Sequence, residues 1–152
     1  MKLSPNFTLR EFTRSQTAER LGLDNTPHTS AVIDNLRRWC ERIGEPVRAH
    51  FGKPVLISSG YRGEELNCAI GGADRSQHMI GEAADFEVVG YSNLEVAQYI
   101  AGGLLFDQLI LELWDGSDPH SGWVHCSTTA RRNRGDTLQL VKGRGYVKGL
   151  PQ

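Results

Sequence analysis

Two side chains that can bind a metal lie seven residues apart in the segment SQHMIGEAADFEV, which runs from Ser76 to Val88. His78 supplies an imidazole and Asp85 supplies a carboxylate, and small residues fill most of the interval between them. Small residues let a loop fold back closely on itself. The imidazole and the carboxylate can therefore reach the same ion.

A second histidine is predicted to reach the same place from a neighbouring strand. Side chains alternate along a strand, so Asp85 faces away from the apolar Phe86 that packs in the core. In the segment SGWVHCS the same alternation puts His125 on one face and Cys126 on the other. Cys126 is therefore a poor ligand candidate, whereas spacing alone leaves open whether His78 and His125 are ligands or ordinary histidines.

Two imidazoles and one carboxylate are typical of a catalytic zinc site. Zinc prefers four ligands in a tetrahedron, and catalytic sites leave one position for water. The ion lowers the pKa of that water to about 7 and polarises a carbonyl group. The predicted cofactor is Zn²⁺, held by His78, Asp85 and His125, with another divalent ion as the alternative.

The elements that must position these residues can be predicted along the chain. Apolar residues recur at helical spacing from about Ser30 to Phe51, and capping-box sequences at Thr8 and Ser92 each open a further helix. Strands are predicted at residues 54–58, 83–89, 106–113, 123–127 and 138–141. Helices come first and strands follow, which predicts an α+β fold: a mostly antiparallel sheet with N-terminal helices packed on it.

The length of 152 residues suits a single domain with one sizeable core. We expect this domain to span residues 1–152, with an N-terminal helical segment at 1–28 and a flexible tail at about 142–152. Three cysteines without C-x-x-C spacing argue against a disulfide framework.

The charge pattern limits the expected partners. With a net charge of -1, no nucleic-acid partner is expected, and the basic run from Arg131 to Arg134 is predicted to be a solvated turn. No apolar stretch is long enough to predict membrane insertion. The N-terminus has no apolar segment typical of a secretory signal, which predicts synthesis in the cytoplasm.

Five motifs extend the pattern beyond the predicted metal ligands. They are Phe7-Thr8-Leu9-x-Glu11-Phe12, Ser59-Gly60-Tyr61-Arg62, Ser76-x-His78-x-x-Gly81-x-Ala83-x-Asp85, Phe106-Asp107-Gln108-Leu109-Ile110-x-Glu112 and Trp123-Val124-His125. In these motifs the chain resembles the family of zinc D-alanyl-D-alanine carboxypeptidases and L-alanyl-D-glutamate endopeptidases, in its phage and prophage carboxypeptidase-like branch. The resemblance covers about residues 5–130, and the family shares its metal site with lysostaphin and hedgehog proteins.

This resemblance implies a hedgehog/D-Ala-D-Ala-peptidase-like fold and zinc ligands at His78, Asp85 and His125. It also implies cleavage of the stem peptides of bacterial peptidoglycan, with Arg62 holding a substrate carboxylate, for which a guanidinium fork is well suited. The residues do not separate a D,D-carboxypeptidase from an L-alanyl-D-glutamate endopeptidase. We expect a monomeric phage or prophage endolysin that acts on the wall after release, or a virion component.

One position departs from the family pattern. Several relatives carry an acid three residues before the last histidine, where this chain has Gly122. Glu112 is the predicted replacement as acid and base, because its apolar neighbours by alternation, Ile110 and Trp114, would raise the pKa of its carboxyl group. The absence of an acid at position 122 also favours an alternative function, that of a non-catalytic zinc-containing virion or cell-wall binding module.

Further roles are predicted for residues near the motifs. Asp118 is the reserve candidate for the base, and His120 in the same loop is a candidate donor to the oxyanion. Ser76 is predicted to orient the ligand or to fix its loop. Trp123 is predicted to line a substrate groove, to shield the metal or to pack the sheet edge. Gln77 and Glu82 are predicted to be exposed.

Overall fold

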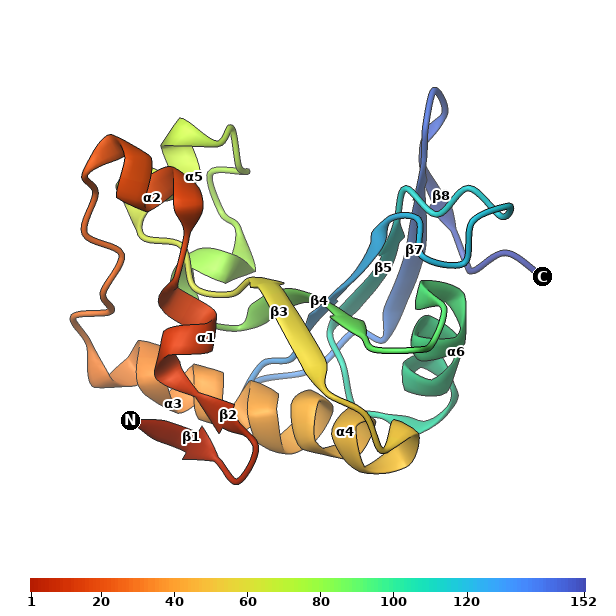
Figure 1. Cartoon of the computed structure of the whole chain (residues 1–152), viewed down its shortest axis with the longest axis horizontal. Helices are drawn as coiled ribbons and strands as arrows, with labels where there is room; N and C mark the ends of the chain where they lie inside the picture. The colour runs from red at the N-terminus through yellow and green to blue at the C-terminus, as the bar shows by residue number, and fades with distance from the viewer.

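A computed structural model describes residues 1–152 (Figure 1). The helices are α1 (Leu9–Thr13), α2 (Gln16–Leu21), α3 (Ser30–Trp39), α4 (Glu45–Phe51), α5 (Glu64–Ala69) and α6 (Asn93–Gly103), with a π-helical turn η1 (Cys40–Gly44) and a 3₁₀ turn η2 (Gln77–Ile80). The strands are β1 (Lys2–Ser4), β2 (Phe7–Thr8), β3 (Val55–Ser59), β4 (Ala83–Val88), β5 (Gln108–Glu112), β6 (Trp123–Ser127), β7 (Asp136–Val141) and β8 (Gly145–Lys148). No helix combines the length and apolar character needed to cross a bilayer.

The main sheet has six strands in the order β3-β4-β6-β5-β7-β8. The α+β class agrees with the prediction, but the sheet is mixed, because β5 and β7 run parallel whereas the other neighbours are antiparallel. The end of β6 lies beside the start of β5, and the loop at 128–135 carries the chain past that end of the sheet. Hydrogen bonds from Gly135 and Asp136 to the carbonyls of Phe106 and Asp107 hold it there, so β7 starts where β5 starts.

One face of the sheet packs into the hydrophobic core, and the opposite face is left for polar side chains. Trp39 lies at the centre of this core, with ring centroids 5.5 Å from those of both Phe12 and Phe86. Its indole nitrogen donates a hydrogen bond to the Cys126 carbonyl at 2.9 Å. A buried tryptophan whose N–H is satisfied contributes apolar area without an unpaired polar group, and it ties α3 to β6.

The segment predicted as one helix from about Ser30 to Phe51 contains a π-helical turn, η1, between α3 and α4. Pro46 is the second residue after this turn; it has no N–H, and its ring would collide with the carbonyl one turn earlier in a regular helix. A π-helical turn contains one residue more than an α-helical turn. Here the additional residue lies just before the proline, where the regular hydrogen-bond pattern is interrupted. Gly44 packs so closely that a Cβ would lie 2.8 Å from the Phe7 ring.

Both chain ends contain strands that were not predicted from the sequence. Residues 1–28 contain the hairpin of β1 and β2 as well as α1 and α2, so the segment is not purely helical. The predicted flexible tail contains β8, which pairs antiparallel with β7. In Figure 1 this hairpin lies on the opposite side of the molecule from α1 and α2. Glycines at 143 and 145 with positive φ form its tight turn, so the Gly-rich composition reflects a turn.

Candidate metal centre

Strand pairing brings Asp85 and His125 together. The two residues are direct partners in the β4–β6 register, and Asp85 Oδ1 lies 2.8 Å from His125 Nδ1. Phe86, Val124 and Cys126 point into the core on the other face, as the alternation predicts. Burial raises the pKa of the Cys126 thiol, which further disfavours it as a thiolate ligand.

His78 reaches the same point from η2. Ser76 precedes this turn and its Oγ accepts a hydrogen bond from the His78 backbone N–H at 3.2 Å. Gly81 ends it at φ +80°, where a Cβ would lie 2.8 Å from the Val32 carbonyl oxygen. The His78 side chain is only 2% exposed, and its Nε2 lies 3.3 Å from both Asp85 Oδ1 and His125 Nδ1.

These three side chains fit a tetrahedral divalent metal ion. Their ligand atoms all lie within 4.8 Å of one another. Ligand bonds of about 2.0–2.1 Å imply ligand atoms roughly 3.3 Å apart in a tetrahedron, and two of the three separations equal that value. His78 Nδ1 contacts the Gly60 carbonyl at 2.7 Å. A carbonyl can only accept, so Nδ1 carries the proton and Nε2 presents its lone pair to the site.

The electrostatics of Asp85 favour a bound cation. Burial would raise the pKa of Asp85, but the interactions with His125 and His78 outweigh burial and hold that pKa well below its usual range. The carboxylate is therefore ionised at neutral pH. A buried carboxylate requires a compensating positive charge, which a divalent ion would supply.

The three side chains lie in a polar cavity of about 620 Å³. The residues lining it include Glu112, Arg62, Ser76 and Trp123 of those predicted from the sequence. They also include a set that was not predicted to belong to the site: Gln77, Glu82, Asp107, Arg131, Arg134 and Tyr146.

Glu112 lies at the end of β5, beside Trp123 in the β5–β6 register. Burial raises the pKa of its carboxyl group, and the negative charge of Asp85 raises it further, while His125 and Arg62 oppose the shift. A raised pKa in a partly buried carboxyl group suits the exchange of a proton during a reaction.

Arg62 is half-buried in the cavity and lacks a full set of partners. Its Nη2 donates to Ser76 Oγ at 3.3 Å, whereas its buried Nε has no hydrogen-bond partner. Burial lowers the pKa of the guanidinium, which Asp85 and Glu112 oppose. The indole nitrogen of Trp123 is also buried and unpartnered. A guanidinium with a free donor is prepared for an anionic ligand.

The structure does not bring Asp118 and His120 into the cavity. Both are exposed in the loop after β5, where Asp118 Oδ1 accepts a hydrogen bond from the His120 backbone N–H at 2.9 Å. Leu113 has φ +55°, which interrupts strand alternation. Trp114 therefore packs against the hydrophobic core and does not line the cavity beside Glu112.

Gly122 is required by the backbone around it. Its φ is +67°, and an added Cβ would overlap the Glu112 carbonyl oxygen. An acid at this position is thus incompatible with the path of the chain here.

We expect Gly122→Ala to lower the free energy of unfolding by about 3 kcal/mol or more, because left-handed strain and overlap with backbone act together. Gly135→Ala is the matched control, since φ is +64° there and no atom lies within 4 Å of the added Cβ. It should cost about 1 kcal/mol. Urea unfolding of both variants measures the difference, and equal losses would contradict a steric requirement at Gly122.

Gln77 and Glu82 are not exposed, contrary to the prediction. Glu82 is buried and Gln77 is partly buried. The Gln77 amide donates to Glu82 Oε1 at 3.3 Å and to Asp107 Oδ2 at 3.1 Å, so it links the ligand-bearing turn to β4 and to the segment before β5.

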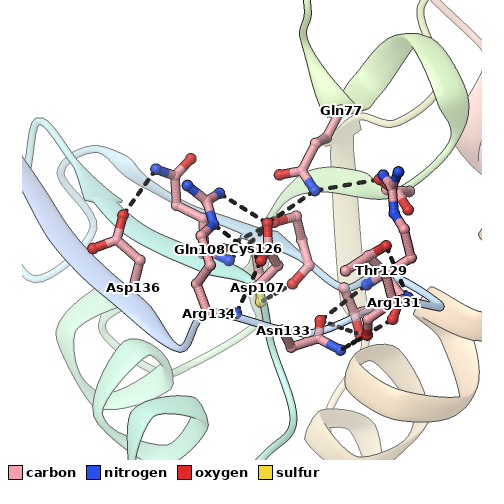
Figure 2. Close-up of polar contacts among 12 residues, drawn as sticks. Gln77, Asp107, Gln108, Cys126, Thr129, Arg131, Asn133, Arg134 and Asp136 are labelled. Atoms are coloured by element: carbon pink, nitrogen blue, oxygen red, sulfur yellow. Dashed lines mark hydrogen bonds and ion pairs between the residues drawn. The ribbon is translucent and has the colours of Figure 1, made fainter.

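The basic run is also more structured than a solvated turn. Arg134 donates to both oxygens of the buried Asp107 carboxylate, at 3.1 and 2.8 Å (Figure 2). In the sequence this ion pair could be recognised only as an acid at the start of a predicted strand and a basic run that follows later in the chain. Only their contact in the fold connects Asp107 with Arg134.

The Asp107–Arg134 pair predicts a pH dependence of stability. Hydrogen bonds from Arg134 hold the pKa of Asp107 below its usual range, despite burial. The stabilisation is therefore complete above the ordinary carboxyl pKa of about 3.9 and is lost as pH falls through the lower folded-state value. We expect Asp107→Asn to cost about 2 kcal/mol at pH 7 and to be less sensitive than wild type to acidification from pH 5 to 3.

Urea unfolding at several pH values measures this effect. Asp34→Asn, which removes an exposed carboxylate outside any ion pair, controls for the loss of one acidic group. Parallel pH profiles of wild type and Asp107→Asn would show that the pair contributes nothing to acid sensitivity.

Comparison with known proteins places the chain in a family. A family model described as Peptidase M15 matches residues 5–127. No curated protein sequence matches the chain. The matched region contains the three candidate ligands, Arg62 and Glu112, and it ends before the loop at 128–135 and the β7–β8 hairpin.

Proposed function

Because the chain belongs to the peptidase M15 family, we propose that it is a zinc-dependent peptidase that cleaves the stem peptides of bacterial peptidoglycan. The observation that carries this proposal is the grouping of His78, Asp85 and His125 in one cavity with Glu112. Enzymes of this family are metal-dependent hydrolases, and the donor set of the chain suits zinc.

Bound zinc would supply a water of lowered pKa and polarise the scissile carbonyl. Glu112 then takes the proton of the attacking water and passes it to the leaving amide nitrogen, which needs one carboxyl group able to act as base and then as acid. The raised pKa of Glu112 suits the second transfer. The His78 imidazole is held in one tautomer by Gly60, so the ligand cluster needs little reorganisation.

Arg62 binds a substrate carboxylate through its unpartnered donors, and Ser76 holds both this guanidinium and the His78 backbone. Trp123 lies beside Glu112 and lines the cavity. Its buried indole N–H has no partner in the protein and is free to donate to a substrate carbonyl.

The shape of the cavity supports an L-alanyl-D-glutamate endopeptidase over a D,D-carboxypeptidase. A carboxypeptidase needs a pocket that closes around the terminal carboxylate. Here the lining residues extend across the sheet, from Arg62 after β3, past the ligands on β4 and β6, to Tyr146 on β8. A substrate chain can therefore continue on both sides of the metal site.

The proposed biological role is that of a monomeric phage or prophage endolysin whose partner is peptidoglycan and which acts after release to the cell wall. A role as a virion component is the related possibility, and neither role calls for nucleic acid or membrane insertion. The peptidase activity itself does not depend on which of these roles holds.

The test combines lysis with product analysis. Gram-negative cells with a permeabilised outer membrane are treated with purified protein as isolated, after chelation and after zinc is restored. Purified muropeptides are digested in parallel and analysed by mass spectrometry. Zinc-dependent release of products cut between L-alanine and D-glutamate is expected, loss of only the terminal D-alanine would identify a carboxypeptidase, and zinc binding without any cleavage would favour a non-catalytic wall-binding module.

A further inference from the structure

The cavity has a wall that lies outside the part of the chain matched by the family model. The model ends at residue 127, whereas Arg131, Arg134 and Tyr146 also line the cavity. The matched region thus contains the candidate metal ligands and Glu112, and the following segment contributes further lining residues.

The loop that carries Arg131 is held by a dense set of hydrogen bonds (Figure 2). Asn133 Oδ1 accepts from the Thr129 backbone N–H at 2.9 Å, and Asn133 Nδ2 donates to the carbonyls of Thr129 and Arg131. Arg134 anchors the far end of the loop on the buried Asp107. The loop is therefore ordered before any ligand binds, which lowers the entropic cost of using its side chains.

Arg131 is the arginine of this loop that remains available to a ligand. The Arg134 guanidinium is occupied by Asp107, whereas the Arg131 guanidinium forms no hydrogen bond or ion pair. In Figure 2 the Arg131 side chain extends from the loop toward Gln77, and both residues line the cavity. Arg132, its neighbour, is exposed and does not line the cavity.

The register places this cation on the side of the metal ligands opposite Glu112. The Thr128 backbone N–H donates to the Glu82 carbonyl at 3.0 Å, which holds the loop beside the start of β4. Glu112 pairs with Trp123 at the other end of β6. His125 lies midway between Trp123 and Ser127, so a substrate that spans the ligands has one part near Glu112 and another near the loop.

We propose that Arg131 is a specificity-determining residue that binds a second carboxylate of the substrate, in addition to the one held by Arg62. The substrate class is accordingly a peptide with two free carboxylates, one for each arginine. This inference rests on the proposed peptidase function and adds the charge requirement of its substrate. A guanidinium fork recognises a carboxylate through two parallel hydrogen bonds, which a carboxamide cannot reproduce.

The experiment uses zinc-loaded full-length protein and synthetic stem peptides in which each carboxylate in turn is replaced by carboxamide. We expect Arg131→Gln to lower kcat/KM about tenfold for the fully acidic peptide, mainly through KM. A tenfold loss is larger than the roughly fivefold effect on binding that an exposed ion pair contributes at most. For the peptide amidated at the carboxylate that Arg131 binds, the variant and the wild type should have equal kcat/KM values. Arg132→Gln is the matched control and should leave kcat/KM unchanged for both the acidic and the amidated peptide.

Two results would overturn the assignment. One is an equal loss for Arg131→Gln on the acidic peptide and on every amidated peptide; the other is an effect no larger than that of Arg132→Gln. If the wild type cleaves no peptide, the proposed function fails. Calorimetric titration with the same peptides then decides the inference: a preference for acid over amide that Arg131→Gln removes supports it, and equal Kd values overturn it.

Discussion

Glu112→Gln is expected to lower kcat by about 10²–10⁴-fold, the range that a positioned acid–base group contributes, while zinc stays bound. Glutamine keeps the size and hydrogen-bonding oxygen of the side chain but can neither take nor release a proton at neutral pH. Glu112 lines the cavity without belonging to the ligand group. Activity should therefore fall without loss of metal, which steady-state kinetics and metal analysis measure together.

Glu87→Gln is the matched control for this experiment. Glu87 lies on β4, two residues from Asp85, and does not line the cavity. Its carboxylate accepts a hydrogen bond from Asn93, a contact that glutamine can keep. Normal activity of Glu112→Gln would show that another group acts as base, and Asp118→Asn in the neighbouring loop would be the next variant to measure.

Removal of the metal is expected to abolish activity and to lower the thermal stability of the protein. A ligand present at about 1,000 times its Kd stabilises the folded state by about 4 kcal/mol, which corresponds to roughly 10 °C in Tm for a chain of this size. Chelation should produce this loss, and added zinc should reverse it, as calorimetry and activity assays would show. His125→Ala should lack both the bound zinc and the response to it.

His28→Ala controls for the loss of a histidine near an aspartate. His28 Nε2 lies 3.3 Å from Asp24 Oδ2, but both side chains are exposed and lie away from the cavity. This variant should bind zinc and respond to chelation like the wild type. A chelator response that persists in His125→Ala would place the stabilising metal elsewhere in the protein.

Most of the metal centre could be predicted from the sequence because strand alternation is a local rule. The two-residue period separates Asp85 from Phe86 and His125 from Cys126 in any half-buried strand. Pairing of β4 with β6 then places the strand face that carries Asp85 beside the strand face that carries His125. The α+β class and the segments of β3 to β6 depend on the same local periods.

The features that the sequence did not predict depend on contacts between distant segments. The π-turn η1 arises where Pro46 meets a helix packed on Phe7, and the parallel partner of β5 follows from the path of one loop. The Gly-rich C-terminal segment pairs as β8 because β7 offers a free edge. Composition carries no information about that edge.

The amino-acid sequence by itself indicated the candidate ligand types, the strand faces that present them and Glu112 as the candidate acid and base. Only the tertiary structure decided that Gly122 excludes a second acid, that Asp118 and His120 stay in solvent, and that Arg131 faces the cavity. The physical reason is range: periodicity acts over a few residues, whereas a cavity wall is made by segments that become neighbours only when the core forms.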